Sequence, residues 1–202
     1  MDIRELDDAV SALIRRKKYA EAEALLQEAR REAVEKADLD TADFVLSELT
    51  ALCCQMEPPE IARAIEFCKE RETIRNTGYN KWQTAMMLYW SAHNYSQTVA
   101  KAREAVQKSL DEADTKTAYS ALSLLGLALL ELDRADEAAA VLANIEDMVQ
   151  QRKSLVVGDE TLFLERANVR GLDRPTIRRI ATILGPVCRD VTFAKRLQAL
   201  SS

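Results

Sequence analysis

The apolar positions of the chain repeat along its first three quarters. A bulky residue is followed three and four positions later by two residues suited to close packing, and another apolar residue comes three positions after those. The pattern begins at residues 6, 46, 82 and 122, so successive copies are 40, 36 and 40 residues apart. A period of this size indicates supersecondary units that stack around one continuous core. The copies read Leu6-x2-Ala9-Val10-x2-Leu13, Leu46-x2-Leu49-Thr50-x2-Cys53, Trp82-x2-Ala85-Met86-x2-Tyr89 and Leu122-x2-Leu125-Gly126-x2-Leu129.

Each copy predicts one helix, and the periodic segment that follows it predicts a second. Asp2 and either Asp40 or Thr41 are expected N-caps, because their side chains can accept a hydrogen bond from the first helical turn. Asn76-Thr77-Gly78 is an expected helix stop. We therefore expect four helix pairs, with helices near 3–16, 19–37, 41–56, 59–76, 80–93, 95–112, 115–132 and 135–153.

The last part of the chain does not continue the repeat. Gly171 and Gly185-Pro186 separate three apolar stretches, and Asp173 is suited to an N-cap position. Since a stack of helix pairs leaves an apolar end, we expect these stretches to cover it. The predicted organisation is a single compact domain with repeats over 1–153, a helical cap over 154–202, and cap helices near 159–169, 174–184 and 187–199.

The repeat resembles the tetratricopeptide repeat, whose signature is W-x2-L-G-x2-Y followed by A-x3-F and a proline. Trp82 and Tyr89 match it in the third copy, and Leu125-Gly126 and Ala138 match it in the fourth. No copy carries every signature residue, the terminal proline is missing, and the spacing exceeds the usual one of about 34 residues. The resemblance implies an all-α, right-handed superhelix in which Gly126 allows its paired helix to approach closely. An irregular helical bundle is the alternative.

The resemblance also implies a concave groove lined by the first helix of each pair. The lining is expected to become apolar and aromatic toward the third and fourth pairs, which suits an extended or helical peptide. The alternative is that the cap helices bury Trp90 and Leu127. The expected groove residues are Phe44, Gln55, Asn80, Gln83, Met87, Trp90, Leu127 and Leu130.

Composition agrees with a helical, soluble protein. Hydrophobic residues make up 48% of the chain and charged residues 30%, with only five glycines and four prolines. No secretory signal or membrane-spanning stretch is evident, and the four cysteines form no Cys-x-x-Cys pair. We therefore expect a cytoplasmic protein with reduced thiols and no membrane association.

Charge is distributed unevenly along the chain. The net charge is −5, but the segment from Gln151 onward carries ten basic and five acidic residues, so the preceding part is strongly acidic. A basic, helix-turn-helix-like tail that binds nucleic acid is therefore an alternative function. Pro186 after the turn glycine, and the absence of Asn or Gln from the stretch "RDVTFAKR" that would read bases, argue against it. The basic residues concerned are Arg178, Arg179, Arg189, Lys195 and Arg196.

The sequence offers little for catalysis. His93 is the only histidine, the glycines are too scattered for a phosphate-binding loop, and the basic clamp of tetratricopeptide domains that hold chaperone tails is missing. We expect no enzyme activity, no cofactor and no metal. The predicted function is a protein- or peptide-binding adaptor or scaffold, with a ligand-sensing or DNA-binding regulator as the alternative and self-association left open.

Overall fold

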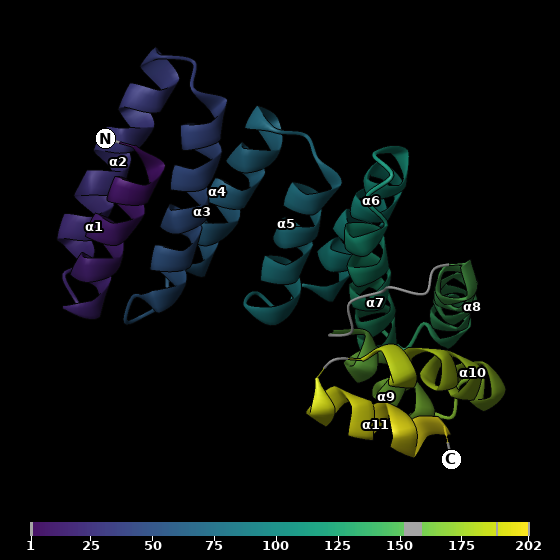
Figure 1. The fold of residues 1–202 in the computed structure, drawn as a ribbon. Coiled ribbons are helices and arrows are strands. Elements are labelled where there is room, and N and C mark those ends of the chain that lie inside the picture. Colours follow the sequence, from purple (N-terminus) through teal and green to yellow (C-terminus); the bar gives the residue numbers. More distant parts are fainter. Residues whose placement is uncertain (1, 152–158, 189, 202) are drawn as a thin grey trace. The chain divides into compact units, whose positions relative to one another are not determined.

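The computed structural model describes residues 2–151, 159–188 and 190–201, and every regular element within these ranges is helical (Figure 1). The prediction of an all-α chain is confirmed for this part of the sequence. Helix boundaries agree closely with those expected from the hydrophobic pattern. The elements are α1 (Ile3–Arg15), α2 (Tyr19–Glu35), α3 (Leu39–Gln55), α4 (Ile61–Ile74), α5 (Gly78–Trp90), α6 (Tyr95–Asp111), α7 (Thr115–Glu131), α8 (Ala135–Gln151), α9 (Asp159–Val169), α10 (Arg174–Leu184), the 3₁₀ helix η1 (Gly185–Val187) and α11 (Val191–Ser201).

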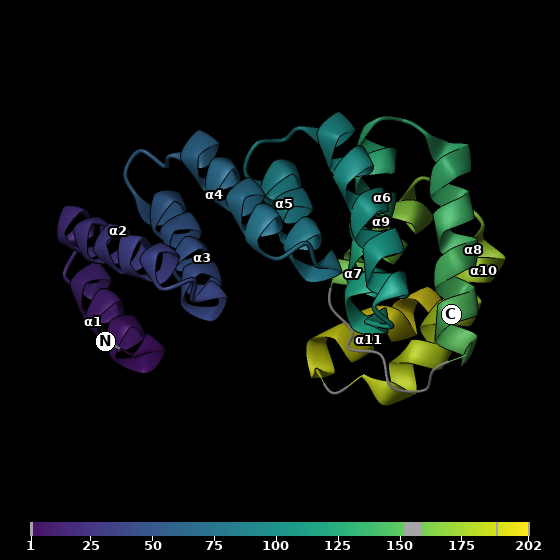
Figure 2. The same cartoon turned by 90° about the horizontal axis from the view of Figure 1, so that it is seen from above.

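The chain forms two compact units, Met1–Asn76 and Thr77–Ser202. The sequence predicts one compact domain in which a cap over 154–202 packs on the last repeat. In the structure the tail helices belong to the second unit: α9 packs against α7, and α10 packs against α8. In both views the green to yellow tail helices lie beside these two helices (Figures 1 and 2).

The first unit contains α1 to α4. Each helix packs against the next one along the chain, and α1 also touches α3. Leu6, Leu26 and Leu46 are fully or almost fully buried in its core. Arg71 of α4 is also buried, and its guanidinium donates two hydrogen bonds to the Asp43 carboxylate at 3.0 and 3.1 Å. Such a bidentate pair compensates much of the cost of removing the arginine from water.

The centre of the second unit is α7. All residues from Ala121 to Leu130 are buried, because α5, α6, α8 and α9 surround this helix. A helix that is apolar on every side is stable only when it is enclosed in this way. The sequence "ALSLLGLALL" therefore encodes a core helix. Over residues 121–130, this helix presents no exposed side that could line a groove.

Gly126 lies where α7 meets α9. A β-carbon placed on Gly126 would be only 2.6 Å from Cε1 of Phe163, whose ring is fully buried. The expectation that Gly126 accommodates the paired helix α8 is therefore wrong. The glycine accommodates an aromatic ring from the tail.

Several interhelical turns share one backbone geometry. Lys17, Ala37, Ala113 and Asp133 all have positive φ, between 51° and 56°, directly after a helix ends. In each turn the next backbone N–H reaches back five residues to a helical carbonyl, as Lys18 N does to Leu13 O at 3.0 Å. This is the Schellman arrangement, and it satisfies carbonyl groups that the helix end leaves open.

Helix starts follow the expected capping chemistry with two corrections. Asp2 and Asp173 are N-caps as predicted, whereas Asp38, not Asp40 or Thr41, caps α3 by accepting from Thr41 N at 3.1 Å. Gly78 does not stop α4. It begins α5 and approaches α6 so closely that a β-carbon there would lie 2.7 Å from Ser109 N.

Candidate functional site

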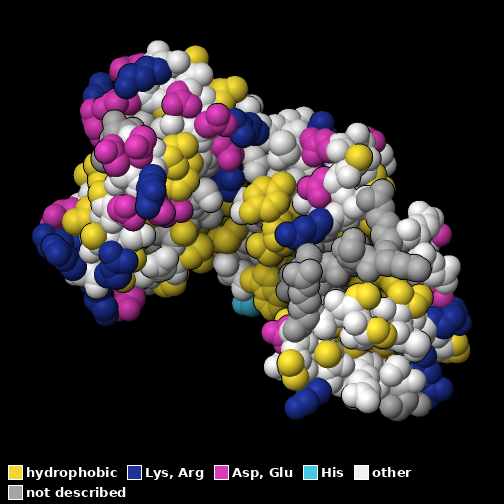
Figure 3. Space-filling view, in the orientation of Figure 1, with side chains coloured by type: hydrophobic (Ala, Val, Ile, Leu, Met, Phe, Trp, Pro, Cys, Tyr) yellow, Lys and Arg dark blue, Asp and Glu magenta, His cyan; other side chains and the backbone are white. Residues whose placement is uncertain are grey.

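One side of α5 carries exposed aromatic side chains. Tyr79, Gln83, Met87 and Trp90 follow each other at intervals of four, four and three residues, which places them on one face of the helix. Tyr79 is 45% exposed and Trp90 is 43% exposed, while Gln83 and Met87 are half-buried. Figure 3 shows hydrophobic side chains gathered over this part of the molecule. We call these four residues the α5 face.

Neighbouring side chains hold the α5 face in place. The Trp90 ring meets the buried Tyr89 ring edge to face, with centroids 4.6 Å apart. At the other end of the helix, Gln83 Nε2 donates a hydrogen bond of 3.1 Å to Tyr79 Oη. Aromatic rings fixed in this way can contact a ligand at a low cost in conformational entropy.

Three of the predicted groove residues in this unit are not available to a ligand. Asn80 is only 3% exposed, and its backbone N–H donates to the N-cap Thr77. Leu127 is fully buried, whereas Trp90 is exposed, so the alternative that both side chains are buried does not hold for Trp90. Leu130 is 4% exposed and forms part of the wall of a cavity of about 320 Å³ between α7 and α9. The expectation of an open groove along α7 is therefore wrong, because α9 packs against this helix.

A polar network joins the tail to the repeats, and the sequence pattern gives no indication of it. Arg166 of α9 donates to Tyr89 Oη at 3.0 Å and pairs with Glu131 at the end of α7. Tyr89 Oη in turn donates to Glu131 Oε1 at 3.3 Å. Burial, with a contribution from Glu131, raises the pKa of Tyr89 to about 12, so the phenol stays protonated and keeps its role as donor.

The remaining predicted groove residues belong to the first unit. Phe44 is half-buried and Gln55 is exposed at the last position of α3. The intervening Glu48 shares their helix face but is missing from the predicted set. Burial, together with the nearby charge of Asp7, raises the pKa of Glu48. Its position four residues after Phe44 and seven before Gln55, on one helix face, is the signal that could have identified it.

The basic residues of the tail do not act as one set. Arg179 forms an ion pair with Glu146, and Arg196 pairs with Glu165 through Nε and Oε1 at 2.6 Å. The Arg179 guanidinium lowers the pKa of Glu146. Arg178 and Lys195 are exposed, and Arg189 lies outside the described residues. Two of the five predicted phosphate contacts are therefore already engaged with carboxylates.

The described residues contain no cluster of three or more His, Cys, Asp or Glu side chains that could hold a metal ion. Burial raises the pKa of the Cys53, Cys54 and Cys68 thiols, which disfavours the reactive thiolate form. Among the described helices, none combines the length and the apolar character needed to cross a bilayer.

No family model fits the sequence, and no curated protein is similar to it. The candidate site is therefore defined by its geometry alone.

Proposed function

We propose that the chain is a non-enzymatic scaffold of the tetratricopeptide-like class that binds a peptide segment of a partner protein on the α5 face. The observation that carries the proposal is the pair of aromatic side chains, Tyr79 and Trp90, left nearly half exposed on a helix whose opposite side is well packed. Rigid aromatic residues of this kind dominate the affinity of many protein interfaces.

The chemistry of the α5 face suits a peptide with at least one large apolar side chain. Trp90 and Met87 offer polarisable contact area, and the Gln83 amide and Tyr79 hydroxyl can exchange hydrogen bonds with a peptide backbone. The proposal needs no cofactor or metal, and it places the protein in the reducing cytoplasm, where the buried thiols remain free.

The repeated turns support the tetratricopeptide-like assignment. Antiparallel helix pairs joined by short, backbone-closed turns are the units from which such solenoids are built. The tail would then act as the terminal cap, which its contacts with α7 and α8 favour. The engaged arginines Arg179 and Arg196 argue against the DNA-binding alternative.

Affinity capture from the native cell extract tests the proposal, with bound proteins compared among the wild type, Trp90→Ala and Leu110→Ala. Leu110 is a matched control, because it is 47% exposed and lies on α6 rather than on α5. We expect Trp90→Ala to lose a specific partner by at least about tenfold in captured amount, which corresponds to about 1.4 kcal/mol. Identical partner sets for all three proteins would contradict the proposal.

A further inference from the structure

A second hollow of about 450 Å³ lies on the tail, between α10, η1 and α11. Its walls include Ala181 and Gly185 on one side and Val191 and Ala194 on the other. The small side chains leave space between two helices that are in contact elsewhere along their length. Val191 is 68% exposed beside this space. We call it the α10–α11 groove, and its volume suits a few apolar side chains.

The rim of the groove is basic. Lys195 carries the only charge among the described lining residues. Arg178 and Arg174 precede Thr182, another lining residue, by one and two helical turns, so both lie on the groove side of α10. All three cations are exposed, and within the described ranges none forms an ion pair.

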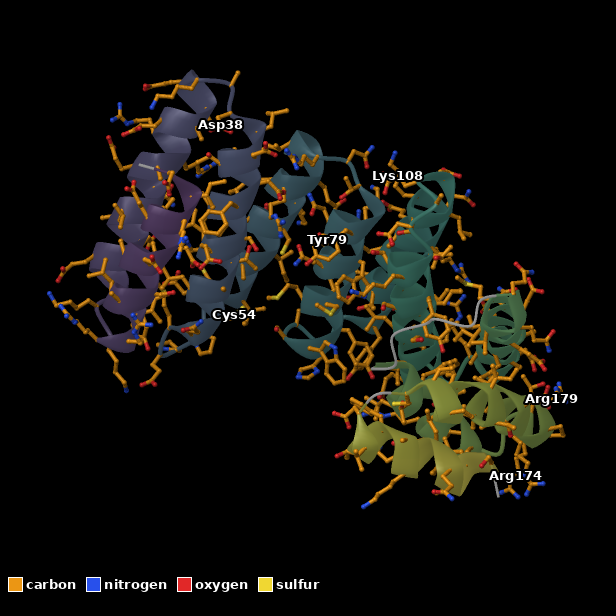
Figure 4. The ribbon with its side chains drawn as sticks, in the orientation of Figure 1. Asp38, Cys54, Tyr79, Lys108, Arg174 and Arg179 are labelled. Carbon is orange, nitrogen blue, oxygen red and sulfur yellow. The ribbon has the colours of Figure 1, made fainter. Side chains whose placement is uncertain are left out.

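The other arginines of the same helices behave differently. Arg179 binds Glu146 of α8 and thereby fastens the tail to the repeats, whereas Arg196 binds Glu165 of α9 and holds two tail helices together. Arg174 and Arg179 extend from different faces of α10 (Figure 4). The basic residues thus divide into an inner set that stabilises the fold and an outer set of three around an apolar groove.

We propose that the α10–α11 groove is a second docking surface, which binds an acidic amphipathic segment of a partner protein. The apolar side chains of the segment enter the groove, and its carboxylates lie beside Arg174, Arg178 and Lys195. This is helix-in-groove recognition with complementary charge. It is independent of the α5 face.

An acidic peptide fits the groove better than a nucleic acid does. A phosphate backbone would use the three cations but leave the apolar lining, including the exposed Val191, in contact with polar groups. Hydrophobic side chains in the figure lie between the Lys and Arg side chains at the edges of the tail (Figure 3). An occupant that is both acidic and apolar satisfies both features.

Fluorescence anisotropy with the full chain tests the proposal. The probe is a fluorescein-labelled peptide of two Leu-Glu-Glu-Leu-Leu-Glu-Glu heptads, compared with one in which Lys replaces Glu and one in which Ser replaces Leu. We expect only the first peptide to bind, with a Kd of about 10–100 µM that weakens as salt rises. Arg178→Glu with Lys195→Glu, and separately Ala194→Trp, should each weaken binding by at least about tenfold.

Matched variants separate this surface from general charge attraction. Arg4→Glu with Lys116→Glu changes the net charge equally at two exposed positions outside the tail and should leave binding unchanged. Equal weakening by this control would overturn the proposal, and so would absence of binding by the acidic peptide. Loss of binding in Trp90→Ala would assign the peptide to the α5 face and also overturn it. Displacement of the peptide by a short DNA duplex at lower concentration would show that the groove serves nucleic acid instead.

Discussion

The ring of Phe163 lies against the backbone of Gly126, with no space between them for a β-carbon. This contact fixes α9 on α7 and closes the side of α7 that would otherwise line a groove. The glycine, which costs about 1 kcal/mol relative to alanine inside a helix, is retained because the ring occupies the position of its missing side chain.

Gly126→Ala should lower the free energy of unfolding by about 1–2 kcal/mol, because overpacking against Phe163 outweighs the gain in helix propensity. Urea denaturation measures the change. Gly185→Ala is the matched control, because a β-carbon at Gly185 has no neighbour within 4 Å. Phe163→Leu added to Gly126→Ala should restore part of the loss, and additive effects in the double variant would rule out the contact as the cause.

Tyr89→Phe should destabilise the second unit by about 0.5–1.5 kcal/mol, because the hydroxyl bridges Arg166 and Glu131. Hydrogen exchange of α9, read by mass spectrometry, should become faster in the same variant. Tyr79→Phe removes an exposed hydroxyl that only accepts from Gln83, so its stability should change by less than about 0.5 kcal/mol. Equal effects of the two substitutions would contradict the role assigned to the network.

Ala37→Gly and Ala113→Gly should each stabilise the protein by about 0.5 kcal/mol. Both alanines have positive φ, which costs an alanine about 1–2 kcal/mol, and this relief exceeds the entropic cost of adding a glycine to the unfolded chain. Thermal denaturation followed by circular dichroism measures the gain. Ala140→Gly provides the opposite case, because this exposed residue lies inside α8 and the change should cost about 1 kcal/mol.

Glu48→Gln should stabilise the first unit at neutral pH but not in acid. The folded-state pKa of Glu48 is raised, so its contribution to stability is fully present below the unfolded pKa of about 4.3 and is lost as pH rises through the folded pKa. Removing the charge should therefore raise the urea midpoint at about pH 7 and leave it unchanged at about pH 3.5. Glu57→Gln, which makes the same change in net charge at an exposed position of the first unit, is the control.

The sequence predicts the helices well because their signals are local. Apolar periodicity and capping residues such as Asp173 depend on neighbours within a turn or two, and these features place most helix ends within two residues of those observed. The turns at Ala37 and Ala113 are also local, but they carry no glycine, so only the end of the periodic pattern marks them.

The candidate site is harder to predict because it depends on contacts between distant segments. Periodicity places Gln83, Met87 and Trp90 together, and it equally marks Leu127 as a groove residue. Whether a side of α7 is open depends on distant segments such as the one that contains Phe163, whose ring lies against Gly126 and which is far along the chain and without the repeat. The ion pair between Arg179 and Glu146 likewise depends on the tertiary fold, and neither local sequence indicates it.

The enclosure of α7 has a consequence for the newly made protein. During synthesis its leucine-rich segment is complete at residue 131, and Phe163 follows roughly 30 residues later. At about 5–20 residues per second the ribosome needs about 2–6 s to add them. For that interval the side of α7 that α9 later covers remains open to water, to other nascent chains and to chaperones, so slow translation of this stretch should favour aggregation.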